Sequence, residues 1–302
     1  MARLVFLGSP APAAVALRAL VGAGHEVALV VTRPDARRGR GPARRANPVK
    51  EAAAELGVAV THRLEDAVAV DAELGVVVAY GRIVPAAVLA ALPMVNVHFS
   101  LLPRWRGAAP VERAVLAGDT ETGVCVMALE ETLDTGPVLA RARVGIGAHE
   151  HAGELTARLA AVGAELLVDT LRAGVASLPA GVAQSGEPTY AEKVTAAELR
   201  LAWERPAAEL ERVVRLDRAW TTLDGERLLV LEARAVPGPD DDGAWGAGAP
   251  PGSVVGCAVR TGEGALELVT VQPSGRRAMP APDWRRGLHA DVVLLGDVPG
   301  PR

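Results

Sequence analysis

The sequence has few aromatic residues and few cysteines. Both shortages limit the classes of fold and of metal or disulfide site that the chain can form. Aromatic residues make up 3% of the 302 residues, whereas 50% are hydrophobic, so the apolar residues are chiefly Ala, Val and Leu. This composition suits helices packed on a valine-rich sheet. Cys125 and Cys257 are too few and too far apart for a paired-cysteine metal site or a disulfide framework, and they suit a reducing cytosol. We therefore expect a cytoplasmic protein.

Long hydrophobic runs and a strong net charge are also missing. No stretch of about eighteen unbroken apolar residues occurs, so we expect no membrane span. The opening MARLVFLGSP has a short apolar run that ends in a turn, so we expect no signal peptide. The formal net charge is −4, and any contact with nucleic acid must therefore come from a local basic patch.

The first half of the chain alternates apolar strands with helices. Strands are expected at 3–7, 26–32, 58–61, 74–80, 95–99, 125–130 and 139–144, and helices at 13–23, 48–56, 85–91 and 151–173. This alternation predicts an α/β domain with a doubly wound, parallel sheet. Ligands of such sheets bind beyond the carboxyl ends of the strands.

The composition changes after Ser177. Residues 178–196 are rich in Gly, Pro and polar side chains, as a linker should be. Thr195 and Glu198 have the spacing of a capping box, and a helix is expected at 206–215. Short strands expected at 227–235, 252–260 and 265–271 predict a small β-barrel. We therefore divide the chain into a domain at 1–177, a linker at 178–196 and a second domain at 197–302.

Three side chains from two segments have the chemistry of a transfer site. In VNVHFSLLPRWRGAAP, residues 95–110, Asn96 and His98 lie two apart on one strand and so point to the same side of the sheet. In ETLDTGP, Asp134 stands just before a glycine turn. An amide that stabilises an oxyanion, an imidazole that accepts a proton and a carboxylate are the groups needed to move an acyl group onto an amine.

Other interpretations of these residues are weaker. A single histidine at a strand end is often only structural, but here it shares a face with Asn96. The Asp-Thr-Gly string also marks aspartic proteases, which need two such carboxylates, and the chain has one copy. The turn after the first strand lacks the GxGxxG of nicotinamide enzymes. His149 and His151 lack the helical spacing of a two-histidine metal site, so no metal is expected.

A basic segment follows the second expected strand. Residues 33–50, RPDARRGRGPARRANPVK, contain seven Lys or Arg and one acidic residue, a local charge of +6 against −10 for the rest of the chain. Charge runs are often only solvated surface, but this one lies at the sheet edge where ligands bind. Arg104 and Arg106 could likewise meet an RNA end or structural carboxylates.

Several segments together resemble the formyltransferase family that uses 10-formyltetrahydrofolate. They are residues 76–85, 95–110, 118–124, 133–139 and 272–279, and the resemblance extends from about residue 3 to about residue 289. Within the family the chain is most similar to members that act on methionyl initiator tRNA, and this activity is therefore expected. The resemblance implies a Rossmann-like formyltransferase domain followed by an OB-like barrel domain that binds tRNA.

The resemblance also implies roles for individual residues. Asn96, His98 and Asp134 correspond to the catalytic residues of the family, and the basic segment to a loop that enters the tRNA acceptor end, with Arg37, Arg38 and Arg40 as contacts. The folate site would be floored by Ser100, Leu101, Leu102 and Pro103. The implied partners are 10-formyltetrahydrofolate as co-substrate and methionyl initiator tRNA, with no metal, no membrane and a monomeric chain.

Two segments depart from the family pattern, and two rival functions stay open. Ala11 stands where the family usually has an acidic residue, and the stretch 215–220 is a few residues short. One rival is an N-formyltransferase acting on an amino sugar nucleotide, which would use the same three side chains. The other is an RNA-binding module whose first domain is inert. The basic segment and the expected C-terminal barrel argue against the first rival, and the intact Asn/His/Asp set argues against the second.

Overall fold

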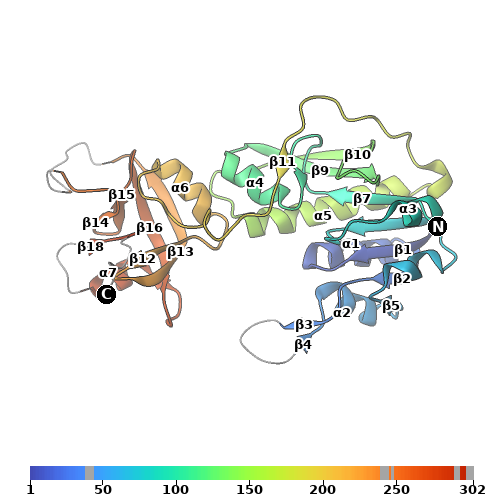
Figure 1. The fold of residues 1–302 in the computed structure, drawn as a ribbon, viewed down its shortest axis with the longest axis horizontal. Coiled ribbons are helices and arrows are strands. Elements are labelled where there is room, and N and C mark those ends of the chain that lie inside the picture. The colour runs from blue at the N-terminus through green and yellow to red at the C-terminus, as the bar shows by residue number, and fades with distance from the viewer. Residues whose placement is uncertain (38–43, 239–244, 246–247, 289–292, 297–302) are drawn as a thin grey trace. The chain divides into compact units, whose positions relative to one another are not determined.

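The structure is a computed structural model that describes residues 1–37, 44–238, 245, 248–288 and 293–296. Its contacts divide the chain into two compact units, whose elements are labelled in Figure 1. The first unit comprises Met1–Val111, Thr120–Ile146 and Glu154–Glu192, and the second comprises Glu112–Asp119, Gly147–Gly153 and Lys193–Arg302. The contacts thus group residues 178–192 with the first unit. The domain boundaries at 177 and 197 stay a prediction.

The first unit is built on a seven-stranded sheet in the order β10-β9-β7-β6-β1-β2-β5. Its strands are β1 (Arg3–Gly8), β2 (Glu26–Val31), β5 (Val60–Thr61), β6 (Leu74–Val78), β7 (Met94–His98), β9 (Glu121–Ala128) and β10 (Val138–Gly145). The strands from β7 to β5 pair in parallel, whereas β9 is antiparallel to both β7 and β10. The predicted α/β class with a doubly wound parallel sheet is confirmed.

Helices cover both faces of this sheet. They are α1 (Ala11–Gly22), α2 (Pro48–Glu55), α3 (Ala86–Ala91), α5 (Ala152–Leu171), and the 3-10 turns η1 (Leu64–Val68) and η2 (Val175–Ser177). A Cβ on Gly163 of α5 would lie 3.1 Å from Val97 and 3.2 Å from Val124, so the glycine lets α5 pack closely on one face. None of the described helices combines the length and apolar character needed to cross a bilayer.

The opposite face carries the core that supports the end of β7. Val5, Leu7, Val77 and Met94 from the strands pack there with Tyr80. Leu92 and partly buried side chains of η1 and α3 cover this cluster. Because side chains alternate along a strand, Asn96 and His98 share the face of Met94, on the side away from α5.

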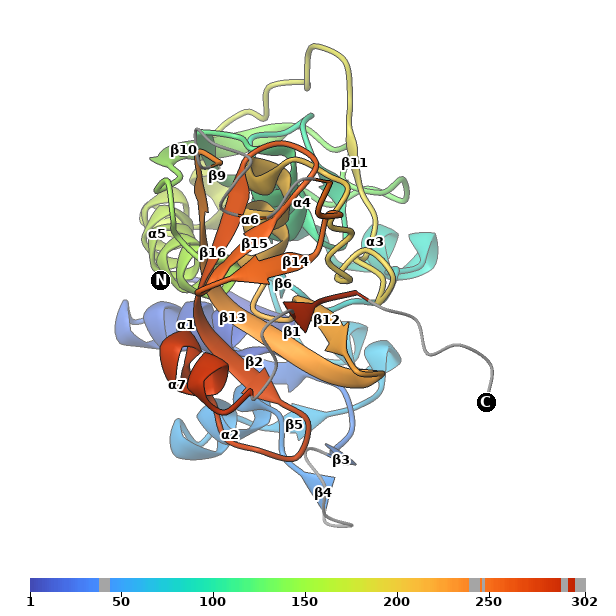
Figure 2. The same ribbon diagram turned by 90° about the vertical axis from the view of Figure 1, so that its left-hand side faces the viewer.

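The second unit is a nearly closed antiparallel barrel, whose strands are labelled in Figure 2. Its strands run in the order β12-β13-β16-β15-β14-β18, with β17 paired to β16. They are β12 (Trp220–Leu223), β13 (Glu226–Val236), β14 (Ser253–Val255), β15 (Ala258–Arg260), β16 (Ala265–Pro273), β17 (Met279–Pro280) and β18 (Val293–Leu294). The barrel interior is filled by residues that include Trp203, Leu210, Val230 and Trp284. Helices α4 (Pro110–Ala117), α6 (Ala207–Val214) and α7 (Ala281–Arg286) complete the unit, apart from Pro110 and Val111, which belong to the first.

The prediction of a single strand at 252–260 is wrong, because the chain forms a hairpin there. Strands β14 and β15 pair with each other, with Val254 opposite Val259 and Val255 opposite Ala258. The two residues between the strands include Gly256, whose φ of 59° is a left-handed conformation that glycine adopts without strain. The apolar residues on both sides of this turn hide it in the sequence.

The predicted capping box is confirmed, although it closes a turn rather than opening a helix. The backbone N–H of Thr195 donates to Glu198 Oε2 at 2.9 Å, and the backbone N–H of Glu198 donates to Thr195 Oγ1 at 3.3 Å. Arg113 of α4 also binds Glu198, with 2.5 Å between Nη1 and Oε1. The Arg113 guanidinium and the Thr195 backbone N–H hold the pKa of Glu198 at about 2, against an ordinary 4.5.

Glu198→Gln should make the second unit less stable at neutral pH and less sensitive to acid. Because folding lowers the pKa of Glu198, its stabilisation is complete above pH 4.5 and disappears as pH falls toward about 2. The Glu198 side chain is 38% exposed, so the loss at pH 7 should be at most about 1 kcal/mol. Urea unfolding between pH 7 and pH 3 measures it, with Glu209→Gln as the control because Glu209 forms a surface pair with Arg205. An unchanged pH dependence in Glu198→Gln would contradict the assignment.

Candidate active site in the first unit

Strand β7 delivers two polar side chains to the carboxyl end of the parallel sheet. Asn96 lies between Val77 of β6 and Met127 of β9, and His98 lies opposite Cys125 of β9. The His98 side chain is buried, with 5% of the residue exposed, whereas Asn96 is half-buried. Within the described residues the Asn96 carboxamide has no hydrogen-bond partner, so its donors are available to a ligand.

The third predicted side chain, Asp134, comes from the connection between β9 and β10. Its backbone is left-handed, with φ 52°, a conformation that aspartate tolerates better than most residues. Gly136 follows in the same turn, and a Cβ there would lie 2.0 Å from the carbonyl oxygen of Ala128. The turn therefore requires a glycine at this position. It brings a buried carboxylate, 7% exposed, to the side of His98.

The imidazole of His98 is held between a carbonyl and a carboxylate. Its Nε2 lies 2.8 Å from the backbone oxygen of Trp105, and its Nδ1 lies 3.7 Å from Asp134 Oδ2. A carbonyl oxygen only accepts hydrogen bonds, so Nε2 carries the proton in the neutral ring. The unprotonated nitrogen is then Nδ1, which faces the carboxylate.

The backbone around Asp134 keeps this carboxylate oriented. The N–H of Gly107 donates to Asp134 Oδ2 at 2.8 Å, the same oxygen that faces His98. If Nδ1 accepts a proton, the resulting imidazolium is stabilised by a buried negative charge close by. The structure thus brings His98 and Asp134 together, with Asn96 on the same face of β7. This arrangement can stabilise an oxyanion and accept a proton from an amine.

Two of the four residues expected to form the floor of the folate site, Ser100 and Leu102, have their side chains engaged within the protein. Ser100 is fully buried and its hydroxyl donates to the backbone oxygen of Arg104 at 2.6 Å. Leu102 packs with Cys125, Met127 and Val138. Leu101 and Pro103 are half-buried, so a ligand can meet their side chains as well as the backbone of residues 100–103. The role of Ser100, Leu101, Leu102 and Pro103 in folate binding stays a prediction.

Residues 182–191, which we call the strap, lie within the predicted linker and contact the loops that carry Trp105 and Asp134. Strand β11 (Tyr190–Ala191) pairs in parallel with β8 (Arg106–Gly107), directly after the loop that contacts His98. Val182 pairs with Val138 at the start of β10. The side chain of Gln184 in the strap contacts the Asp134 turn. A lone glutamine in a Gly/Pro-rich stretch gives no sequence signal for such a contact.

The basic segment is anchored at its base. Strands β3 (Ala36–Arg37) and β4 (Arg44–Arg45) pair with each other. Lys50 forms an ion pair with Asp35 at 2.8 Å. Of the three predicted RNA contacts, Arg38 and Arg40 lie outside the described residues, and Arg37 is described only in its backbone, as part of β3. Their role stays a prediction.

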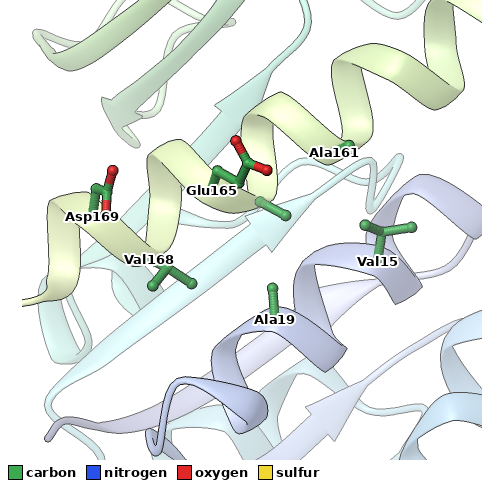
Figure 3. A pocket seen from close by; sticks show the side chains of 7 residues that line it. Val15, Ala19, Ala161, Glu165, Val168 and Asp169 are labelled. Atoms are coloured by element: carbon green, nitrogen blue, oxygen red, sulfur yellow. The ribbon is translucent and has the colours of Figure 1, made fainter.

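A surface groove between α1 and α5 lies away from this chemistry. Figure 3 shows its lining, in which small apolar side chains of both helices face one another and Glu165 and Asp169 stand along α5. Helix α5 packs on the face of the sheet opposite His98. The described lining of the groove contains no amide, imidazole or thiol, so we place the site at the end of β7 instead.

Comparison with protein families places both units. The formyl transferase model matches residues 2–171, and the model of the formyl transferase C-terminal domain matches residues 193–289. This chain belongs to the formyltransferase family. The family membership expected from the sequence is confirmed.

Curated members of the formyltransferase family match over nearly their whole length. A methionyl-tRNA formyltransferase of Dinoroseobacter shibae is 45% identical, with 97% of this chain and 99% of the relative covered. The protein of the same name from Paracoccus denitrificans is 44% identical, with 95% and 97% covered. That of Symbiobacterium thermophilum is 44% identical, with 95% and 93% covered.

Solved structures of formyltransferases share the fold at low sequence identity. HypX from Aquifex aeolicus, in complex with tetrahydrofolic acid, gives a TM-score of 0.66 at 17% identity, covering 94% of this chain and 46% of that one. An N-formyltransferase from Helicobacter canadensis, in complex with folinic acid and dTDP-3-aminofucose, gives 0.66 at 14% identity, covering 90% and 100%. These likenesses support the fold alone.

Cys125, opposite His98 in the sheet, should be chemically inert in the folded protein. Burial raises the pKa of the Cys125 thiol, which keeps it protonated and a poor nucleophile at neutral pH. In the variant Cys257→Ser, where Cys125 is the remaining cysteine, iodoacetamide should label the protein in denaturant and leave the native protein unlabelled over the same time. Rapid labelling of the native variant would show an accessible thiol and contradict the described packing.

Proposed function

We propose that this protein transfers the formyl group of 10-formyltetrahydrofolate to the amino group of methionyl initiator tRNA, in the cytoplasm and as a monomer. The observation that carries the proposal is the meeting of His98 and Asp134 beside Asn96 at the carboxyl end of β7. The relatives that are 42–45% identical over almost the whole chain carry the name methionyl-tRNA formyltransferase. The structural relatives with folate compounds bound support folate as the formyl donor.

Asn96 has the role of oxyanion donor in this mechanism. When the amine attacks the formyl carbon, negative charge develops on the formyl oxygen. The Asn96 amide is half-buried and unpartnered within the described residues, so it can donate to this oxygen. Removing a single donor of this kind typically costs about 3–4 kcal/mol of transition-state stabilisation. The folate derivative supplies an activated formamide, so no covalent bond to the protein is needed.

His98 and Asp134 handle the proton of the attacking amine. The Nδ1 lone pair of His98 accepts this proton, since Nε2–H is already donated to the Trp105 carbonyl at 2.8 Å. The Asp134 carboxylate, 3.7 Å from Nδ1, stabilises the imidazolium and its Oδ2 is kept in place by the Gly107 N–H. The imidazolium then returns the proton to the leaving nitrogen of the folate as the carbon–nitrogen bond breaks.

Two further features support the proposed partners. Ile83 follows β6 at the same end of the sheet and is 80% exposed, so it offers apolar surface to a flat ring system. The basic segment 33–50 begins at the end of β2, two strands away from β6 in the parallel sheet. Its local charge of +6 suits the phosphates of an RNA end better than a single sugar nucleotide.

The direct test offers radiolabelled 10-formyltetrahydrofolate to the purified protein with different acceptors. Label should appear on methionyl-tRNA, and neither on uncharged tRNA nor on amino sugar nucleotides. Label on the sugar but not on the aminoacyl-tRNA would replace the proposal by the amino sugar alternative. Methionyl-tRNA binding without transfer to any acceptor would favour an inert RNA-binding module.

His98→Ala should remove transfer while leaving RNA binding almost unchanged. Loss of the proton acceptor is expected to lower kcat by about 10²–10⁴-fold. The dissociation constant for methionyl-tRNA should stay within about twofold, because His98 is buried and faces the reacting group rather than phosphates. Single-turnover transfer and filter binding measure the two quantities. Retained chemistry together with lost RNA binding would mean that the roles are misassigned.

Replacing Arg37, Arg38 and Arg40 together by alanine should have the opposite effect. RNA affinity should fall most at low salt, and the slope of log affinity against log salt should become shallower by about two to three if each arginine neutralises one phosphate. The single-turnover rate at saturating RNA should change little. A matched control replaces Arg18, Arg63 and Arg172, which form carboxylate pairs elsewhere in the first unit. Equal salt slopes in the two triple variants would show that the basic segment does not contact the RNA.

A further inference from the structure

Gln184 lies at the centre of a polar network that joins the two loops of the site. Its Nε2 donates to the backbone oxygens of Asp134 at 2.8 Å and Gly136 at 2.9 Å. Its Oε1 accepts from Arg106, with 3.1 Å to Nε and 2.7 Å to Nη2. One half-buried carboxamide thus links the strap, the Asp134 turn and the loop before Gly107.

The network uses the full hydrogen-bonding capacity of the Gln184 amide. An amide nitrogen has two protons and an amide oxygen has two lone pairs, and all four have partners here. The orientation is fixed, because a guanidinium can only donate and the two backbone carbonyls can only accept. A carboxylate of the same shape would keep Arg106 but would face the two carbonyls without a proton to donate.

The groups that Gln184 holds are those that set the geometry around His98. The Asp134 backbone is in the left-handed region, and its carbonyl is fixed by the glutamine while its carboxylate faces His98. Arg106 stands between Trp105, whose carbonyl binds His98 Nε2, and Gly107, whose N–H binds the Asp134 carboxylate. A shift of either loop would change both contacts of the imidazole.

The rest of the strap holds the loop that precedes Gly107. The hydroxyl of Thr189 accepts from the Trp105 N–H at 2.8 Å, and the carbonyl of Thr189 accepts from the Arg106 N–H at 2.8 Å. Thr189 fixes one of the two loops, whereas Gln184 bonds to both. The relative position of the two loops is therefore set by Gln184 together with the hydrogen bond from the Gly107 N–H to the Asp134 carboxylate.

We propose that Gln184 is a positioning residue for formyl transfer. It keeps Asp134 and the Trp105 carbonyl in their positions on either side of the His98 ring. The inference rests on the proposed function, in which His98 and Asp134 act on the amine. Gln184 does not touch the reacting atoms, so it acts through these two groups. A purely structural strap contact would affect the stability of the protein but not the chemistry of the folded enzyme.

Gln184→Ala and Gln184→Glu in the full chain separate these roles. Both should lower kcat by about ten- to a hundredfold, as small displacements of catalytic groups do, with KM for the folate donor and for methionyl-tRNA within about twofold. Gln272→Ala is the matched control, since Gln272 donates to the Arg276 carbonyl in the second unit.

A second readout does not depend on activity. The ring-nitrogen NMR signals of His98 should change in both Gln184 variants and stay unchanged in Gln272→Ala. Unaltered His98 signals with wild-type kcat, in folded Gln184 variants, would overturn the inference. If His98→Ala abolishes transfer while the Gln184 variants are fully active, the inference fails and the proposed function stands. If the wild-type protein formylates no acceptor, both the proposed function and the inference are contradicted.

Discussion

The proposed chemistry depends on the two contacts that hold the imidazole of His98. His98 Nε2 is fixed by the Trp105 carbonyl, and Nδ1 is left facing the Asp134 carboxylate. The first contact chooses the tautomer and the second places a negative charge beside Nδ1, so the ring can take a proton at one defined atom. Both partners lie on loops, and these loops need the strap to hold them. A segment that resembles a linker in composition is therefore part of the proposed active site.

The order and direction of the strands explain why these contacts to His98 form at the end of β7. Period-two alternation along β7 places Asn96 and His98 on the face away from α5, and the parallel order of β6 and β7 puts their carboxyl ends side by side. The antiparallel strand β9 then returns the chain to the amino end of β7, where Ala128 lies opposite Val95, and the connection to β10 brings Asp134 back beside His98. Glycine at position 136 lets this connection pass within contact distance of the Ala128 carbonyl. The chemistry thus depends on the strand order as much as on the three side chains.

Much of this could be predicted from the sequence, for identifiable physical reasons. The strands of the parallel sheet are continuous apolar runs, and the spacing of Asn96 and His98 on one of them follows from alternation. The hairpin at Gly256 could not be predicted, because valine and alanine continue on both sides of the turn. The helix α4 was not predicted, because its first residue, Pro110, is also the last residue of the segment 95–110, which was interpreted for its active-site residues. The role of Gln184 comes from contacts with residues about 50 and 78 positions away, which no local pattern encodes.

The nitrogen NMR spectrum of the His98 ring shows which ring nitrogen carries the proton. In uniformly labelled protein at alkaline pH, we expect a neutral imidazole with its proton on Nε2 and an unprotonated Nδ1. The assignment comes from comparison with His98→Gln, which removes this ring alone. A proton on Nδ1 in the neutral ring, or the averaged signals of a freely exchanging surface histidine, would contradict the account.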